Sequence, residues 1–203
     1  GRMEVSGSRI SREDFAAYIT QVSDVIAAMT KDGYPHPTAF EIETAVAFLF
    51  FKKENCDLVL LEVGMGGNLD ATNIIKNTLL AVLVSISMDH MSFLGNTLAQ
   101  IAEKKAGIIK DGCRVVTARQ KPEAMQVIER ISREHGAKCT IADASEAEVL
   151  KESCFGQTIR YRGEEYEVPL AGVYQKENAV VALNALKVLD ELGFPTAAEQ
   201  KKE

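Results

Sequence analysis

The chain has 203 residues, of which 46% are hydrophobic and 26% are charged, a composition typical of a folded globular protein and unlike that of a disordered, collagen-like or coiled-coil chain. Its formal net charge is −6 and it has no long run of Lys or Arg, so we expect no nucleic-acid partner. Its longest apolar stretches, at residues 45–51 and 79–84, are far shorter than the roughly 20 residues that cross a bilayer, so we expect no membrane span.

Two helices are predicted first in chain order. Ser11 is suited to an N-cap, apolar side chains follow it at helical spacing, and Gly33 ends the pattern. Thr38 and Glu41 then have the spacing of a capping box, which begins a second helix that runs towards Glu54. Because the second helix has apolar side chains on most of its faces, we expect it to be well buried.

Short β-branched runs alternate with helical stretches in the rest of the chain, a pattern typical of an α/β protein. Residues 57–63, DLVLLEV, are almost continuously apolar, which predicts a central parallel strand covered on both faces. A second buried strand is expected over residues 79–87, a third at residues 115–116 and a fourth at residues 139–142.

Three more helices and a hairpin are predicted around these strands. Thr97 caps a helix that Gly107 can end in a left-handed conformation. Further helices are expected over residues 122–135 and 175–189. Residues 158–168 alternate between polar and apolar side chains, which predicts a polar hairpin at an edge.

The elements together predict a three-layer α/β fold with a mostly parallel sheet and a small edge hairpin. We expect one domain over residues 1–195 and a short charged tail at residues 196–203.

The cysteines predict a reducing compartment. The chain has four cysteines, Cys56, Cys113, Cys139 and Cys154. They form no C-x-x-C pair and have no His at zinc-finger spacing. No N-terminal segment resembles a signal peptide, and we therefore expect a cytoplasmic protein with free thiols.

Two polar residues follow the first two predicted strands. In an open parallel sheet ligands gather outside the carboxyl ends of the strands, so Glu62 and His90 become candidates for a shared site. A carboxylate and a neutral imidazole that converge there could hold a divalent metal beside a phosphate. The alternative is that Glu62 caps a loop amide and His90 is an ordinary loop histidine.

A glycine-rich turn and a group of lysines lie near these candidates. Gly64, Gly66 and Gly67 suit a turn whose backbone closely approaches another group, although G-x-G-G is neither a Walker A sequence nor a dinucleotide fingerprint. Three lysines lie on or just after the helix that Thr97 caps: Lys104, Lys105 and Lys110. Either one of them faces a phosphate, or all three serve solubility alone.

Five segments in order resemble the folylpolyglutamate and dihydrofolate synthase branch of the Mur ligase superfamily. They are GRMEVSGSRIS from Gly1, HPTAFEIETAVAFLFF from His36, LEVGMGGNLDATN from Leu61, SISMDHMSFLGNTLAQIAEKKAGIIK from Ser85 and GVYQKENAVVAL from Gly172. The resemblance runs through most of the chain, and it implies a domain of the P-loop and Mur-ligase central type. It also implies that ATP phosphorylates a carboxylate of folate or dihydropteroate, after which the amine of glutamate attacks the acyl phosphate.

The resemblance also implies site residues. Glu62 and His90 match Mg²⁺ ligands, and His90 and Lys105 are expected to be catalytic, with Lys105 at the position of a carbamylated lysine. Gln175 and Asn178 fall in a motif that approaches the nucleotide base. The loop between the nucleotide and pterin sides supplies the remaining expected cofactor-binding residues: Gly64, Gly66, Gly67, Asp70 and Asn73.

The chain also departs from the family pattern. Asn68 replaces the usual Arg, Lys104 replaces Glu and Tyr174 replaces His. It begins at Gly1 and contains no G-x-x-x-x-G-K-[ST] phosphate loop, so we interpret it as the middle of the ATPase domain, processed, engineered or cut from something longer. Removing the strand before that loop leaves strand edges without partners, and we expect an exposed edge or its repair, for example by self-association.

Three functional interpretations remain open. The first is a fragment of folylpolyglutamate synthase that is inactive alone, with dihydrofolate synthase as the alternative within the same branch. The second is a non-catalytic remnant that binds a folate or a partner protein, which the missing phosphate loop and the three departures favour. The third is a purely structural α/β module.

Overall fold

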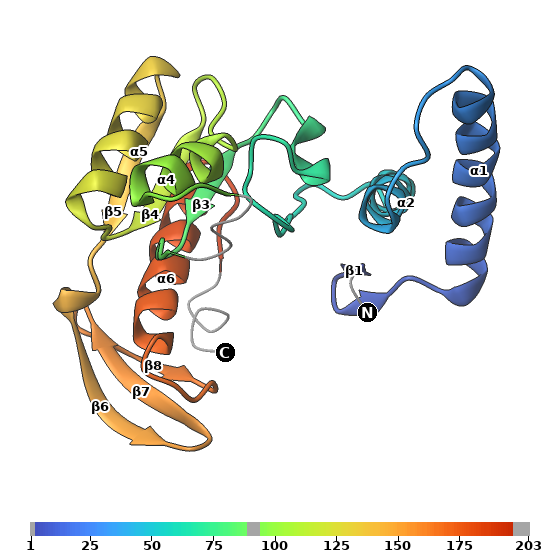
Figure 1. Ribbon diagram of the computed structural model, residues 1–203. Coiled ribbons are helices and arrows are strands. Elements are labelled where there is room, and N and C mark those ends of the chain that lie inside the picture. The colour runs from blue at the N-terminus through green and yellow to red at the C-terminus, as the bar shows by residue number, and fades with distance from the viewer. Residues whose placement is uncertain (1–2, 89–93, 197–203) are drawn as a thin grey trace. The chain divides into compact units, whose positions relative to one another are not determined.

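The computed structural model describes residues 3–88 and 94–196, which form two compact units (Figure 1). The first unit comprises residues 1–64 and 70–74, and the second comprises residues 65–69 and 75–203. The single domain predicted over residues 1–195 stays a prediction. Among the described residues, no helix is both long and apolar enough to cross a membrane.

The first unit is a hairpin followed by two helices. Strands β1 (Glu4–Val5) and β2 (Ser8–Arg9) pair antiparallel, and the helices are α1 (Arg12–Lys31) and α2 (Ala39–Lys53). Both helices begin as predicted, because Ser11 accepts a hydrogen bond from the Asp14 N–H and Thr38 forms a complete capping box with Glu41.

A small core holds this unit together. Val46 and Phe50 on α2 are buried against Met3, and half-buried side chains of α1 pack around them. A 3-10 turn, η1 (Ala71–Ile74), packs beside α2 and completes the unit. The expected burial of α2 is confirmed in part: Val46 and Phe50 are buried, but Phe40 is 36% exposed.

The second unit has three layers. Its parallel sheet has the order β3-β4-β5, with strands at Leu80–Leu83, Arg114–Ala118 and Lys138–Ala142. Its helices are α4 (Leu98–Ala106), α5 (Pro122–Glu134) and α6 (Gln175–Glu191). Helices α4 and α5 cover one face of the sheet and α6 covers the other (Figure 1).

Alternation along the strands explains the two covered faces. Ala81, Leu83 and Val115 point into the core beneath α4 and α5, whereas Val116 and Ala118 join the core beneath α6. Strands β3 and β4 therefore pack both of their faces against the helices, whereas Ile141 of β5 is 39% exposed. The three-layer α/β fold with a parallel sheet is confirmed.

A second sheet packs against the other side of α6. Its antiparallel strands have the order β6-β7-β8, at Ala147–Ser153, Gly156–Tyr161 and Glu164–Val168, and a short turn, η2 (Ala144–Glu146), leads into it. The predicted edge hairpin is the β7-β8 pair. Strand β6 was not predicted, because only Ala147 of its seven residues is buried and its sequence therefore carries no clear apolar alternation.

The strand predicted over residues 57–63 is wrong. These residues form no strand in the part of the chain that the structure describes, and Leu60 is 92% exposed. A strand exists only through hydrogen bonds to a neighbour, and an apolar run without a neighbour stays irregular. The exposed strand edge that we expected stays a prediction, because a segment that forms no strand has no strand edge.

Candidate functional site

Asp70 organises the loop that the sequence marks as glycine-rich. One carboxylate oxygen of Asp70 accepts a hydrogen bond from the Gly64 N–H at 3.0 Å. The other accepts hydrogen bonds from the N–H of Thr72 at 3.0 Å and from its hydroxyl at 2.6 Å. The Asp70 backbone carbonyl also accepts from the Asn73 N–H at 2.9 Å. Asp70 therefore closes the loop onto η1 and sets the position of Asn73.

Gly64 lies where this loop passes closely by α2. A Cβ atom at Gly64 would lie 2.8 Å from the Phe40 ring, closer than real Cβ contacts allow. The expected close backbone approach is therefore confirmed at this glycine, and the group that it approaches is an aromatic side chain of the same unit.

The next part of the loop, in the second unit, lies directly on the end of α4. The Asn68 N–H donates a hydrogen bond to the Lys104 carbonyl at 3.0 Å. A Cβ at Gly67 would lie 2.6 Å from that carbonyl and 2.8 Å from the carbonyl of Lys105. Gly66 has a φ of +73°, a conformation that favours glycine. The glycines thus allow backbone to pack on backbone.

The sequence predicts that Gly107 ends α4 in a left-handed conformation, and that conformation is wrong. This residue follows α4 with a φ of −61°, so it does not adopt the left-handed conformation. A Cβ there would instead overlap Asn68. Gly107 is required by the close approach of the loop, which is a contact between segments far apart in the sequence.

Lys105 lies in the last turn of α4 and is half-buried. The structure brings its backbone beside Gly67, so two of the predicted site elements meet in the second unit. Lys110 is also tied to this turn, because its ammonium donates to the Gly107 carbonyl at 3.3 Å. The turn thus packs its backbone carbonyls against the glycine-rich loop, and of its lysines Lys110 places its ammonium on this backbone.

Glu62 and His90 are not brought together by the described residues. Glu62 is exposed in the irregular segment 57–63, and His90 lies outside the described residues. Among residues 3–88 and 94–196, no three His, Cys, Asp or Glu side chains cluster as a ready metal site. Mg²⁺ is commonly bound by one or two carboxylates together with substrate phosphates, so an exposed Glu62 fits that kind of site.

Gln175 and Asn178 do lie together. They occupy the first turn of α6, where the Asn178 side-chain amide donates to the Gln175 side-chain oxygen at 3.4 Å. Gln175 is half-buried and Asn178 is exposed. Side-chain amides offer both donors and acceptors, so this pair fits a ligand such as a nucleotide base.

Gln120 is a residue that sequence reasoning missed. It follows β4 at the carboxyl edge of the parallel sheet, where its side-chain oxygen accepts from the Ile86 N–H at 2.9 Å. Its amide nitrogen donates to the Val84 carbonyl at 2.9 Å and to the Thr117 hydroxyl at 3.1 Å. The side chain thereby fixes the segment that follows β3. A single Gln has no sequence signature that indicates such a role.

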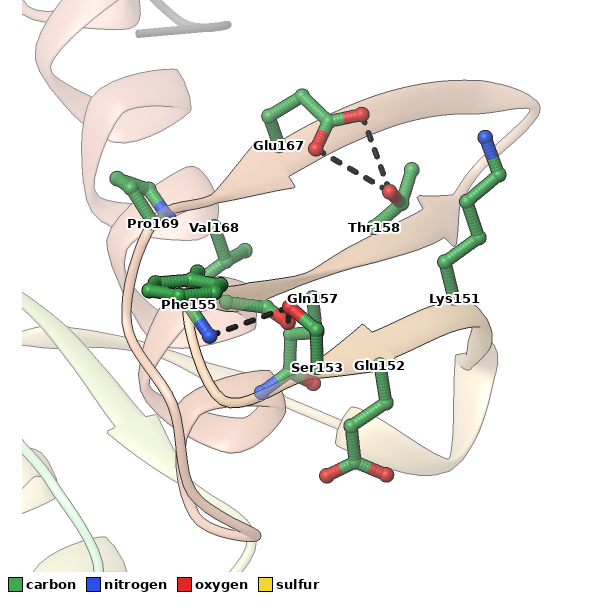
Figure 2. A pocket seen from close by; sticks show the side chains of 10 residues that line it. Lys151, Glu152, Ser153, Phe155, Gln157, Thr158, Glu167, Val168 and Pro169 are labelled. Atoms are coloured by element: carbon green, nitrogen blue, oxygen red, sulfur yellow. Dashed lines mark hydrogen bonds between the residues drawn. The ribbon is translucent and has the colours of Figure 1, made fainter.

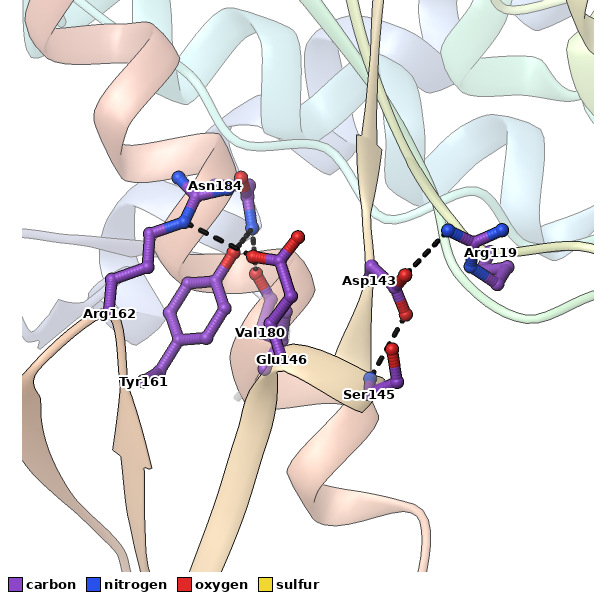
Figure 3. A network of polar contacts seen from close by, with 8 residues as sticks. All are labelled: Arg119, Asp143, Ser145, Glu146, Tyr161, Arg162, Val180 and Asn184. Carbon is purple, nitrogen blue, oxygen red and sulfur yellow. Dashed lines mark hydrogen bonds and ion pairs between the residues drawn. The ribbon is translucent and has the colours of Figure 1, made fainter.

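An ion pair ties the ends of β4 and β5 at the same edge. Arg119 donates to the Asp143 carboxylate at 2.5 Å, and Asp143 also accepts from the Ser145 N–H at 3.0 Å (Figure 3). The hydrogen bond from Arg119 and then that from Ser145 hold the pKa of Asp143 well below its ordinary value. The carboxylate is therefore ionised at neutral pH and anchors η2.

A buried polar contact joins α6 to the antiparallel sheet. The Asn184 amide, 2% exposed, donates to the Tyr161 hydroxyl at 3.1 Å and to the Val180 carbonyl at 2.7 Å (Figure 3). A buried amide is costly without partners, and the bond to Tyr161 joins α6 to β7.

A pocket of about 600 Å³ lies on the antiparallel sheet (Figure 2). Its lining includes Thr158, whose hydroxyl donates to Glu167 at 3.0 Å. Ten residues line it: Lys151, Glu152, Ser153, Phe155, Gly156, Gln157, Thr158, Glu167, Val168 and Pro169. Since no predicted site residue is among them, the pocket is not the candidate site.

Comparisons with known proteins match the chain to a family model and to several relatives. A family model described as the Mur ligase middle domain matches residues 13–186. The dihydrofolate synthase/folylpolyglutamate synthase of Bacillus subtilis (strain 168) is 39% identical over 199 residues, which cover 94% of this chain and 46% of that relative. The chain therefore spans about half the length of this relative.

Solved structures of folylpolyglutamate synthase (FPGS) share the fold. The apo form of L. casei FPGS matches with a TM-score of 0.84 and 27% identity, over 98% of this chain and 50% of that one. An FPGS–AMPPCP–folate complex matches with a TM-score of 0.79 and 28% identity, over 92% of this chain and 47% of that one.

Proposed function

This chain belongs to the Mur ligase middle-domain family, and on that premise we propose that it is the central part of an ATP-dependent ligase that joins glutamate to a folate. The observation that carries the proposal is the contact between Gly67 and the turn of Lys105, which joins two of the motifs that resemble the family. The names of the relatives and the folate complex support the choice of substrate.

In the proposed reaction ATP donates a phosphoryl group to a folate carboxylate, and the amine of glutamate then displaces phosphate and forms an amide. Such chemistry depends on neutralising charge and excluding water. The turn of Lys105 and the backbone at Gly66 and Gly67 are suited to lie beside the anionic groups. Lys105 as a carbamate would add a carboxylate there.

The remaining predicted residues have separate proposed roles. Gln175 and Asn178 hold the nucleotide base through their amides. Asp70 and Asn73 shape the loop between the nucleotide and the folate. Glu62 and His90 bind Mg²⁺, with His90 also in a catalytic role. We place this reaction in the cytoplasm, which agrees with the four free cysteines.

The test is phosphate release from Mg-ATP by the intact protein, measured with and without a reduced folate and glutamate. Release that requires both substrates, together with a longer glutamyl chain on the product, supports the proposal. Release that is independent of folate, or none at all, contradicts it.

Dihydrofolate synthase activity is the second candidate within the same branch, since the Bacillus subtilis relative carries both names. The same assay with dihydropteroate in place of folate separates the two activities. A product with dihydropteroate alone assigns dihydrofolate synthase, and products with both substrates assign a dual enzyme.

A non-catalytic remnant is the third candidate, favoured by Asn68, Lys104 and Tyr174 at positions where the family pattern differs. Calorimetric titration of this chain with Mg-ATP tests it. Dissociation constants of about a millimolar or below argue against a remnant.

A further inference from the structure

Gln157 lies on β7 with its side chain buried, and only 6% of the residue is exposed. Its amide nitrogen donates a hydrogen bond to the Gly172 carbonyl at 3.1 Å. Gly172 lies in the loop between β8 and α6, so the contact joins the antiparallel sheet to the segment before that helix.

The Gly172 carbonyl also accepts a second hydrogen bond, from the Gln175 N–H at 3.1 Å. Gln175 is the first residue of α6, and its side-chain oxygen in turn accepts from Asn178 at 3.4 Å. Hydrogen bonds thus link Gln157 and the Gln175 backbone to the same Gly172 carbonyl, and the Gln175 side chain to Asn178.

The Gly172 loop has little packing of its own. Leu170 is 55% exposed, Val173 is 78% exposed and Tyr174 is 69% exposed. Tyr174 occupies the N-cap position of α6 and makes no side-chain capping bond. Gly172 itself has a φ of +125°, a conformation in which other residues are strained. The direction of its carbonyl thus depends on the donors that hold it.

Gln157 is well placed to be such a donor, because its own backbone is held firmly. It pairs with Val168 across the sheet. At the preceding residue, Gly156, a Cβ would overlap the Val168 carbonyl, so the two strands are in close contact there. A donor on a rigid strand can fix a flexible loop at low entropic cost.

We propose that Gln157 is a positioning residue for the nucleotide end of the site: its buried amide holds the Gly172 carbonyl, and through it sets the first turn of α6 that presents Gln175 and Asn178. The inference rests on the proposed function for the identity of the ligand. Gln157 does not touch the ligand itself, and its side chain acts through the loop.

The test compares Gln157→Met, which keeps the length of the side chain and removes the donor, with Thr158→Val. Thr158 is the matched control because it is the next residue of β7, is 7% exposed and bonds to Glu167, not to the loop. Hydrogen exchange of the backbone amides of residues 172–178 is measured by mass spectrometry on this chain. Binding of AMPPCP with Mg²⁺ is measured by calorimetry.

Gln157→Met is expected to speed exchange in residues 172–178 by about fivefold or more, the size of effect that one lost hydrogen bond produces. It is also expected to raise the AMPPCP dissociation constant by a similar factor. Thr158→Val leaves both values within about twofold of those of the unaltered chain. In the intact ligase, KM for ATP rises while kcat stays within about twofold.

Unchanged exchange in Gln157→Met overturns the inference. Faster exchange with an unchanged AMPPCP dissociation constant overturns it as well, because the loop would then be held without any effect on the ligand. Failure of the proposed function has a different result: the unaltered chain itself does not bind AMPPCP, while the exchange contrast between the two variants still decides whether Gln157 holds the loop.

Discussion

The side-chain oxygen of Gln120 accepts a hydrogen bond from the backbone N–H of Ile86 at 2.9 Å, just beyond the last paired residues of β3 and β4. The same side chain donates to the Val84 carbonyl, so one amide serves two backbone groups of the neighbouring segment. The Gln120 amide thus continues the parallel ladder past Leu83 and Thr117, where the strands themselves stop pairing.

Replacing Gln120 with Leu is expected to lower the free energy of unfolding by about 1–3 kcal/mol, because the Ile86 N–H and the Val84 carbonyl lose their partner. Urea unfolding followed by circular dichroism measures the change. Lys121→Ala, at the exposed neighbouring position, is the control and should stay within about 0.5 kcal/mol. Equal stability of the two variants would show that the amide is not needed.

Gly107→Ala is expected to lower the free energy of unfolding by about 1–3 kcal/mol, the usual cost of forcing extra atoms into a packed site. Alanine tolerates the φ of −61° at this position, so the cost reports the overlap with Asn68 and not backbone strain. The control is the single variant Asn68→Ala, in which Gly107 is unchanged and the close backbone approach is kept. A neutral or stabilising Gly107→Ala would mean that the loop does not rest on α4.

The Arg119–Asp143 pair predicts a pH dependence of stability. The folded-state pKa of Asp143 is depressed, so its contribution is present above the unfolded pKa and is lost as the pH falls through the folded value. Between about pH 4 and pH 2, the urea concentration at the midpoint of unfolding should therefore fall more for the unaltered chain than for the Asp143→Asn variant. Parallel curves for the two proteins in this interval would contradict the assignment.

Lys105→Ala is expected to reduce the ATP-dependent ligase activity of the intact protein by about 10²–10³-fold, since it removes a charged group from the proposed phosphoryl-transfer site. Substrate-dependent phosphate release measures the effect. Lys187→Ala, an exposed position on α6, should leave the rate within about twofold. If the two variants retain equal activity, Lys105 has no catalytic role.

The exposed segment 57–63 predicts self-association of this chain. Leu58, Val59 and Leu60 are 41%, 38% and 92% exposed, and an unpaired apolar run readily pairs with another chain. We propose that a second copy covers it, which sedimentation velocity would detect as dimers or larger species that increase with concentration. Leu60→Lys should restore the monomer without loss of stability, because Leu60 is exposed. A monomer at all concentrations of the unaltered chain would refute the idea.

The helices could be predicted because their signals are local. Thr38 and Glu41 cap α2 through contacts within one turn, and α5 begins at Pro122 as its sequence indicates. The same sequence reasoning failed at residues 57–63, whose apolar run is compatible with a strand but supplies no neighbour. It also failed at β6, whose side chains are mostly exposed.

The candidate site likewise has some features that the sequence predicts and others that only the structure shows. Its motifs could be located from residue types and spacing, and the structure brings Gly67 to the turn of Lys105, and Gln175 to Asn178. The roles of Gln120 and Gln157 could not be predicted from the sequence. A lone glutamine holds a loop only when a backbone group that is distant in the sequence lies within hydrogen-bonding distance of its amide. The convergence of Glu62 with His90 stays a prediction, since His90 lies outside the described residues.

By itself, the sequence determined the layered α/β class, the helix boundaries and the family, since periodicity, caps and motifs are written in residues close together along the chain. Only the tertiary structure decided why Gly107 is a glycine, which glutamines hold the loops and which apolar run is left without a partner. Those features depend on contacts between segments far apart in sequence, whose distances no local pattern encodes.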